Sequence, residues 1–154
     1  MEVEKFSVDS NKKGSVVLVR VEGEIANPKV QVNLTYTVLG NGKLKVDYES
    51  NIDASAPNVP RVGMQFDVAS SYQNLSYLGR DPQPNYINRN YGAEVGFYSG
   101  LVKTMSYRYV KSSEYGNHTN TRWFKIHNNS KGLLVKGDDL LSFVLYTRCA
   151  FRLY

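Results

Sequence analysis

The chain has 154 residues and a net charge of +5, with 42% hydrophobic and 21% charged residues, which is typical of a soluble globular protein. No stretch has the ~18 apolar residues of a membrane helix, and Met1 to Glu4 lacks the apolar run of a signal peptide. We therefore expect no membrane partner, while the compartment stays open. The lysines are scattered rather than clustered in a nucleic-acid-binding module, so we also expect no nucleic-acid partner.

The first third of the chain contains the clearest strand pattern. Residues 1–14 are polar and are expected to end in a turn, residues 15–21 form a strand, and residues 22–28 interrupt it. In residues 29–39, apolar side chains alternate strictly with polar ones, which predicts a strand with one buried face. Gly40-Asn41-Gly42 then predicts a hairpin turn, and the same alternation returns in residues 43–49.

The remainder alternates between short strands and polar loops. After a loop at residues 51–60, we expect strands at residues 61–68, 75–78, 93–97, 101–109, 121–127, 133–136 and 140–148. Two long polar loops, residues 79–91 and 111–120, interrupt this series, and Asp138-Asp139 is expected in a turn. Because no stretch has helical periodicity, we predict an all-β antiparallel sandwich forming a single domain over residues 1–154.

The loop of residues 79–91 is unusually specific for a simple connection. Its two prolines remove backbone donors, and its asparagines favour turns. It also carries Arg80, Tyr86 and Arg89, which are large side chains able to make directed contacts. Long loops on a β scaffold are common binding sites, although a tyrosine-anchored structural loop is a slightly better interpretation.

Several classes of chemistry lack their sequence patterns. The single cysteine, Cys149, excludes an internal disulfide. His118 and His127 have no histidine or cysteine at metal-ligand spacing, so both are expected to be ordinary surface residues, with no metal site. We see no glycine-rich phosphate loop and no Ser/His/Asp order, and we expect no cofactor.

A series of rare-residue motifs resembles a known family. In order they are PRVGM from residue 60, YLGR from 77 with Pro82, Asn85-Tyr86 and Arg89, VG from 95 with Tyr98, Tyr109-Val110, Glu114, GN from 116 with Thr119, TRW from 121, and GLLV from 132. This order resembles the C-terminal small-chain domain, or fifth domain, of glycoside hydrolase family 2 β-galactosidases, over about residues 35–145. The family pattern reads roughly PRIGM, YGRGPxENYxDR, VGxY, PYVxPxExGNRTDxRW and GLLVxG.

The resemblance implies a fold, a parent enzyme and a partner. The fold would be the first half of a large β-sandwich related to galactose mutarotase. The parent would hydrolyse terminal β-galactosides, and this domain would flank the catalytic barrel and shape its active site. Because the family's catalytic glutamates lie on the barrel, the resemblance implies a non-catalytic chain whose partner is the barrel domain or subunit.

The carboxylates of this chain agree with that expectation. Retaining glycoside hydrolysis needs two carboxylates about 5 Å apart. The candidates are Asp67, Asp81, Glu94, Glu114, Asp138 and Asp139. No local spacing brings two of these together beside a pocket, so we assign no catalytic residue.

Carbohydrate binding remains the best chemistry for the two loops. Sugars are held by aromatic stacking and by planar polar groups such as those of arginine and asparagine. The candidates are Arg80, Asn85, Tyr86, Arg89, Glu114, Asn117, Arg122 and Trp123. The alternative is that Arg80, Arg89, Glu114 and Arg122 form a buried network that joins the loops, with Trp123 in the core.

Three roles are therefore open. The chain is an architectural domain of a β-galactosidase, a free-standing sugar-binding module for galactosides, or a small subunit that completes a larger enzyme in trans. A half-sandwich leaves sheet edges and apolar surface that need a partner, so association into a homo-oligomer also stays open.

The chain departs from the family pattern at several charged positions. Asp81 replaces a glycine, Pro84 a glutamate, Asn88 an aspartate, His118 an arginine and Asn120 an aspartate. If these charges form a network in the family, we expect neutral hydrogen bonds in their place here. We interpret residues 79–91 mainly as a clasp against residues 114–123.

Overall fold

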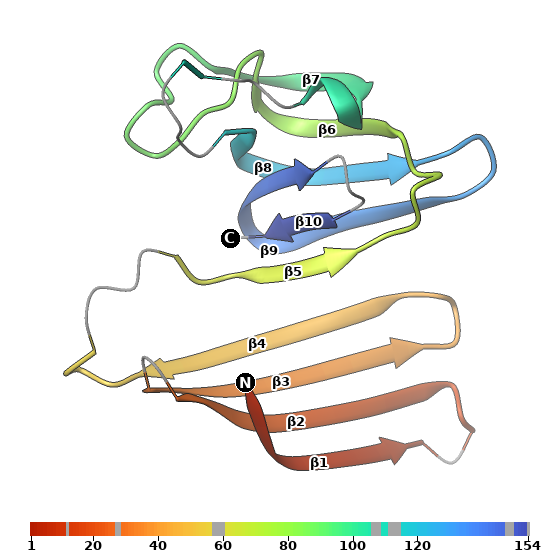
Figure 1. The fold of residues 1–154 in the computed structure, drawn as a ribbon. Helices are drawn as coiled ribbons and strands as arrows, with labels where there is room; N and C mark the ends of the chain where they lie inside the picture. The colour runs from red at the N-terminus through yellow and green to blue at the C-terminus, as the bar shows by residue number, and fades with distance from the viewer. Residues whose placement is uncertain are drawn as a thin grey trace. The chain divides into compact units, whose positions relative to one another are not determined.

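A computed structural model describes residues 1–11, 13–26, 29–56, 61–105, 109–110, 115–146 and 150–153. The described residues form ten strands and one short 3-10 helix, in two antiparallel sheets (Figure 1). The prediction of an all-β antiparallel fold is confirmed. The chain divides into two compact units, residues 1–60 and 61–154, which are described separately below. The assignment of residues 1–154 to one domain stays a prediction.

The first unit is a four-stranded meander. Its strands, in the order in which they pair, are β1 (Glu2–Ser10), β2 (Val16–Ala26), β3 (Lys29–Leu39) and β4 (Leu44–Ile52). The predicted hairpin lies between β3 and β4, where Leu39 N donates to Lys43 O at 2.9 Å and Gly42 adopts a φ of 84°. Glycine suits that left-handed backbone because it has no Cβ.

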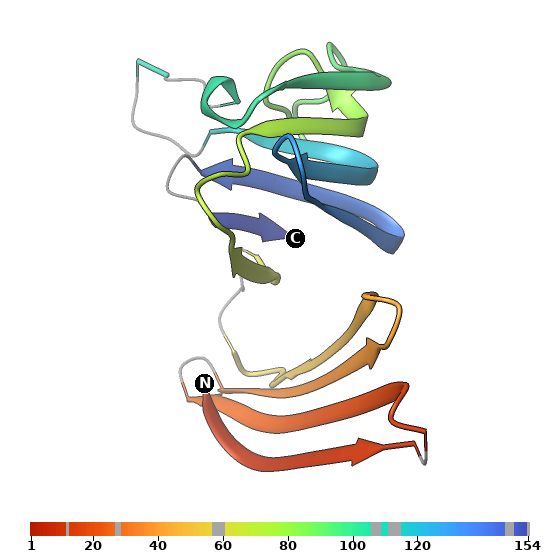
Figure 2. The same ribbon diagram turned by 90° about the vertical axis from the view of Figure 1, so that its right-hand side faces the viewer.

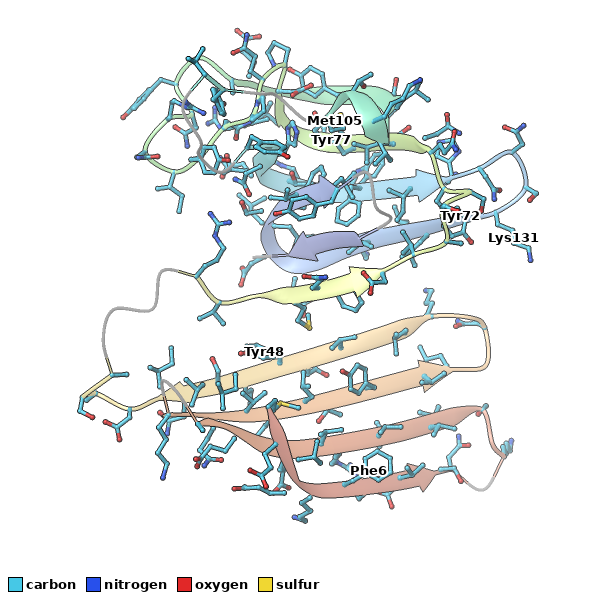
Figure 3. The ribbon with its side chains drawn as sticks, viewed as in Figure 1. Phe6, Tyr48, Tyr72, Tyr77, Met105 and Lys131 are labelled. Carbon is cyan, nitrogen blue, oxygen red and sulfur yellow. The ribbon has the colours of Figure 1, made fainter. Side chains whose placement is uncertain are left out.

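One face of this sheet is apolar because the alternation predicted for β3 is repeated on its neighbours. Phe6, Val21, Leu34 and Tyr48 are cross-strand partners and form one row over all four strands. Figure 3 labels Phe6 and Tyr48, the two ends of that row. The opposite face carries ion pairs such as Lys5–Glu22.

One expectation for this unit is wrong, and one strand was not predicted. β2 continues to Ala26 although residues 22–28 were expected to interrupt it, and residues 2–10 form β1, which their polar sequence did not indicate. In both cases the backbone hydrogen bonds of the ladder are available to any side chain. Polar residues such as Glu22 and Glu24 are accommodated because alternate side chains point to the polar face.

The second unit is a six-stranded sheet with the strand order β5-β10-β9-β8-β6-β7 (Figures 1 and 2). The bounds of its elements are β5 (Met64–Asp67), β6 (Asn74–Asp81), β7 (Glu94–Leu101), η1 (Val102–Thr104), β8 (Asn117–His127), β9 (Gly132–Tyr146) and β10 (Ala150–Leu153). No described helix is long and apolar enough to cross a membrane.

The core of this unit lies on one face of the three central strands. It consists of Leu75 and Tyr77 from β6, Phe124 and Ile126 from β8, and Phe143 and Leu145 from β9. The ring of Phe143 stacks on Phe124 with centroids 4.6 Å apart and meets Tyr77 edge-on at 5.4 Å. Tyr72, Val102 and Met105 pack against this cluster, and Figure 3 labels Tyr72, Tyr77 and Met105.

The structure corrects several boundaries in this unit. Gly79 to Asp81 belong to β6 rather than to the loop, and β8 begins at Asn117, inside the predicted second loop. Residues 133–136 and 140–148 were expected to be separate strands, but β9 runs without interruption from Gly132 to Tyr146, so Asp138 and Asp139 lie in a strand rather than a turn. Residues 102–104 form a 3-10 helix where extended chain was expected. In each case pairing with a neighbouring strand or local turn geometry overrides local composition.

Candidate functional site

Asn85 is the centre of the contact between the β6–β7 loop and β8. Its side chain is 1% exposed. The amide Nδ2 donates to the carbonyl oxygens of Arg80 and Gln83, both at 3.0 Å. Its Oδ1 accepts from Thr119 N at 2.9 Å and from Thr119 Oγ1 at 2.5 Å. All the hydrogen-bonding groups of this side chain are therefore used within the protein.

Asn117 makes the reciprocal contact from β8. Asn85 N donates to Asn117 O at 2.7 Å, and Asn117 Nδ2 donates to Asn85 O at 2.7 Å. Asn117 Oδ1 accepts from Ser142 Oγ at 3.0 Å, which connects the pair to β9. Because both asparagines are buried, these bonds hold the loop on the sheet without any ligand.

Arg80 lies near the end of β6 and contacts the backbone at the C-terminal end of the loop. Its Nη1 donates to the carbonyl oxygens of Ala93 at 2.5 Å and of Asn90 at 3.3 Å. Its Nε is buried without a hydrogen-bond partner among the described residues. The guanidinium thus pairs with backbone carbonyls, which fixes the return of the loop into β7.

A buried group of polar side chains lies beneath this loop. His118 is 1% exposed, and its ring stacks on Phe143 with centroids 5.3 Å apart. His118 Nδ1 lies 3.3 Å from Tyr77 Oη, from Arg80 O and from Asp81 Oδ1. Burial raises the pKa of Tyr77 well above its usual value of 10.0, and its hydrogen bond to the Asp81 carboxylate raises it further.

The prediction that His118 is a surface residue is wrong. His118 is in β8, where the pairing with Phe143 of β9 places its ring against the core. The surrounding polar sequence suggested an exposed loop, and nothing in that sequence signals the aromatic ring from β9. His127 is only partly buried and ends β8 as expected.

Tyr86 and Arg89 form the tip of the loop. They pair as an isolated bridge, with Arg89 N donating to Tyr86 O at 2.8 Å. The Arg89 guanidinium lies 5.5 Å from the Tyr86 ring centroid and 5.1 Å from that of Tyr109, and its Nη2 donates to Tyr109 Oη at 2.5 Å. Arg89 itself is exposed, so the tip presents a cation between two aromatic rings.

Arg122 and Trp123 lie on β8 rather than in the loop. Arg122 is exposed, and its Nη1 donates to Asn120 O at 2.6 Å. Trp123 is half-buried and contacts Phe97 of β7, with ring centroids 5.9 Å apart. The interpretation of Trp123 as a core residue is therefore wrong, because its position in the alternation of β8 is opposite to that of the core residue Phe124.

The eight candidate residues thus fall into three groups. Arg80, Asn85 and Asn117 meet at the base of the loop, Tyr86 and Arg89 form its tip, and Arg122 and Trp123 lie on the sheet. Glu114 lies outside the described residues. Tyr77 and Thr119 belong to the family motifs but were not named as site residues, because their contacts with His118 and Asn85 join distant parts of the chain.

The carboxylates are arranged in a way that the sequence spacing did not predict. The β6–β7 register places Asp81 opposite Glu94. Asp81 is half-buried, with Oδ1 3.3 Å from His118 Nδ1, whereas Glu94 is exposed. No group of three metal-ligating side chains occurs among the residues that the structure describes.

A cavity of about 380 Å³ lies on the core side of the six-stranded sheet. Its lining includes the core residues Ile126 and Leu145, together with Val68, Tyr72 and Val102. None of the seven candidate residues that the structure describes lines it. These seven side chains and the cavity are therefore separate features.

Comparison with known proteins identifies the family. The family model described as beta galactosidase small chain matches residues 1–152. The chain belongs to the β-galactosidase small-chain family. The resemblance seen in the loop motifs is thereby confirmed.

Individual relatives agree with this assignment. The chain is 32% identical to a β-galactosidase of Priestia megaterium over 122 residues, which is 79% of the chain and 12% of that relative. It is 34% identical to a β-galactosidase of Streptococcus thermophilus over 105 residues, 68% of the chain and 10% of the relative. It is 30% identical to a β-galactosidase of Kluyveromyces lactis over 135 residues, which is 83% of the chain and 13% of that relative. The matched stretch is thus a small part of each relative.

Proposed function

We propose that this small-chain unit is a non-catalytic β domain of a glycoside hydrolase family 2 enzyme that hydrolyses terminal β-galactosides. Its role is architectural: it flanks and shapes an active site whose catalytic carboxylates lie in a barrel outside this chain. The observation that carries the proposal is the coverage of the relatives, because this chain corresponds to only 12% of the Priestia megaterium β-galactosidase. Most of the enzyme is therefore supplied elsewhere.

The apolar face of the first sheet supports a role in packing against the rest of that enzyme. Phe6 is 63% exposed, Val8 55% and Leu44 55%, and all three lie on the face that carries the row from Phe6 to Tyr48. Exposed apolar surface of this kind marks an interaction site. We propose that the remaining polypeptide of the parent enzyme covers it, either in one chain or as a separate subunit.

The clasp at the base of the loop supports a structural role for most of the candidate residues. Asn85 and Asn117 use their polar groups on each other, on Thr119 and on Ser142. A sugar hydroxyl would have to displace these buried bonds, at a cost of about 1–3 kcal/mol for each group left unpaired. Their role in our proposal is to fix the position of the loop tip.

A free-standing sugar-binding module is the second candidate, and the loop tip is the observation that favours it. There Arg89 lies between the rings of Tyr86 and Tyr109, and Arg89 is exposed. Aromatic faces beside planar donors are groups that bind sugars. In this alternative, Tyr86 and Arg89 would contact a galactoside directly.

Two assays of the purified chain test these proposals. With a chromogenic β-galactoside, we expect no turnover above the buffer rate, while the Priestia megaterium enzyme serves as the positive control. Turnover that scales with the concentration of the chain would overturn the non-catalytic proposal. Calorimetric titration with galactose and lactose tests the second candidate: heat that disappears in the Arg89→Ala variant would favour it, and no heat at millimolar sugar would reject it.

A further inference from the structure

Strand β7 is an edge strand of the six-stranded sheet, and it has almost none of the features that usually prevent an edge strand from pairing with another chain. Its outer side pairs with no described strand, and β6 is its neighbour on the inner side (Figure 1). Natural edge strands are usually blocked by lysine, proline, a bulge or a short length. The sequence of β7, EVGFYSGL, is eight residues long and has one charge, at its first position.

The sheet face next to this edge is apolar and exposed. Phe97 is 65% exposed and Val95 is 43% exposed. Leu78 of β6 is the cross-strand partner of Phe97 in β7 on one side and of Trp123 in β8 on the other, so the three residues form a row across three strands. The Phe97 and Trp123 rings meet with centroids 5.9 Å apart. An apolar row therefore runs to the open edge, where an added strand would continue it.

The charges around β7 indicate which strand would fit. Glu94 begins the strand, and Lys103 follows two residues after its end. Neither side chain forms an ion pair with a residue in the described ranges. If two copies of β7 align antiparallel, the end that begins with Glu94 in one copy lies beside the end that leads into η1, with Lys103, in the other. A parallel alignment would instead place like charges together.

We propose that β7 is an interface at which a second copy of this chain adds its own β7 in antiparallel orientation. A pairing centred on Tyr98 sets Phe97 opposite Ser99 of the second copy. Side chains that face each other across an antiparallel ladder lie on the same face of the sheet, so the Phe97 rings of both copies extend one apolar surface. The symmetry is two-fold, which is the commonest arrangement of soluble homo-oligomers.

Sedimentation equilibrium of the full chain over a range of concentrations tests this proposal. We expect a reversible dimer, and we expect Val95→Lys and Phe97→Lys to raise its dissociation constant at least about tenfold, because lysine blocks strand pairing at an edge. Leu134→Lys is the matched control. Leu134 is 59% exposed on β9 of the same sheet, away from β7, so this variant should dimerise like the parent chain.

A charge exchange makes the test specific for the antiparallel pair. Glu94→Lys and Lys103→Glu should each weaken the dimer, and the double variant should restore it because the two charges have changed places. Circular dichroism melting establishes that every variant is folded. A chain that stays monomeric at all concentrations would overturn the proposal, as would a dimer that neither the lysine variants nor the charge exchange affects.

Discussion

Asn85 and Asn117 hydrogen-bond each other in both directions: Asn85 N donates to Asn117 O, and Asn117 Nδ2 donates to Asn85 O, both at 2.7 Å. The two residues are 32 positions apart in the sequence and belong to the β6–β7 loop and to β8. Because both are buried, these bonds are shielded from competing water. The loop and the start of β8 are thereby held as one structural element.

Replacing Asn85 with alanine should destabilise the chain strongly. The variant loses the bonds to Thr119, Arg80 and Gln83 and leaves the buried Thr119 N–H without its acceptor. We expect a loss of about 3 kcal/mol in the free energy of unfolding, measured by urea denaturation. Asn88→Ala at the exposed loop tip is the control and should change stability by less than about 0.5 kcal/mol. Equal effects of both variants would show that the clasp does not stabilise the fold.

Gly79→Ala should destabilise the contact between β6 and β8. A Cβ at Gly79 would lie 2.5 Å from Thr121 Oγ1 and 3.1 Å from Thr121 Cα, so the neighbouring strand would have to move. Overpacking of this kind costs about 1–3 kcal/mol in the free energy of unfolding. Gly100→Ala is the matched control, because the nearest atom to its Cβ would be Thr104 Oγ1 at 3.7 Å. A wild-type denaturation midpoint for Gly79→Ala would contradict this close packing.

Much of the fold could be predicted from the sequence, because alternation of apolar and polar residues reports directly on strands. The strand of residues 29–39 and the Asn-Gly turn after it are confirmed with their boundaries. β1 and the end of β2 could not be predicted in this way, since their polar residues lie on a solvated face and are held by ladder bonds. The strand propensity of a sequence describes one segment by itself, whereas strand pairing depends on the neighbouring strands.

The base of the site was harder to predict than the strands. Asn85 and Asn117 were named from the loop motifs, but their mutual contact depends on the register of β8 with β9 and on the path of the loop. His118 shows the limit most clearly. Its burial depends on the ring of Phe143, which is 25 positions later in the sequence.

His118 should carry its proton on Nδ1 when the imidazole is neutral. The Arg80 carbonyl oxygen and the Asp81 carboxylate oxygen Oδ1, each 3.3 Å from Nδ1, can only accept a hydrogen bond. Nε2 is buried without a hydrogen-bond partner in the described part of the chain, so a proton there would be unsatisfied. Two-dimensional NMR of ¹⁵N-labelled protein at alkaline pH should show the Nδ1–H tautomer. The Nε2–H tautomer would contradict this network.

Tyr77 should make the stability of the chain depend on alkaline pH. Burial and the hydrogen bond to Asp81 raise the pKa of Tyr77 in the folded state well above 10.0. Above pH 10 the unfolded chain releases the phenol proton of this tyrosine while the folded chain keeps it, so the unfolded state binds fewer protons than the folded state. The free energy of unfolding should therefore fall by about 1.4 kcal/mol per pH unit above pH 10, and the contribution is fully present below pH 10.

Comparison of Tyr77→Phe with the parent chain isolates this contribution. Urea denaturation between pH 9 and pH 11.5 should show a shallower decline for Tyr77→Phe. Tyr91→Phe, at a fully exposed side chain, should follow the parent chain. Parallel pH profiles for the parent chain and Tyr77→Phe would argue against a buried, neutral Tyr77.

The most direct test of the architectural role is a domain replacement in the Priestia megaterium β-galactosidase, which is 32% identical to this chain over 122 residues. Three proteins would be compared by kcat/KM on a chromogenic β-galactoside: the intact enzyme, a variant without the matched stretch, and a chimera that carries this chain in its place. We predict loss of activity on deletion and recovery of a substantial part of it in the chimera. Full activity of the deletion variant, or a folded chimera that stays inactive, would contradict an architectural role for this chain.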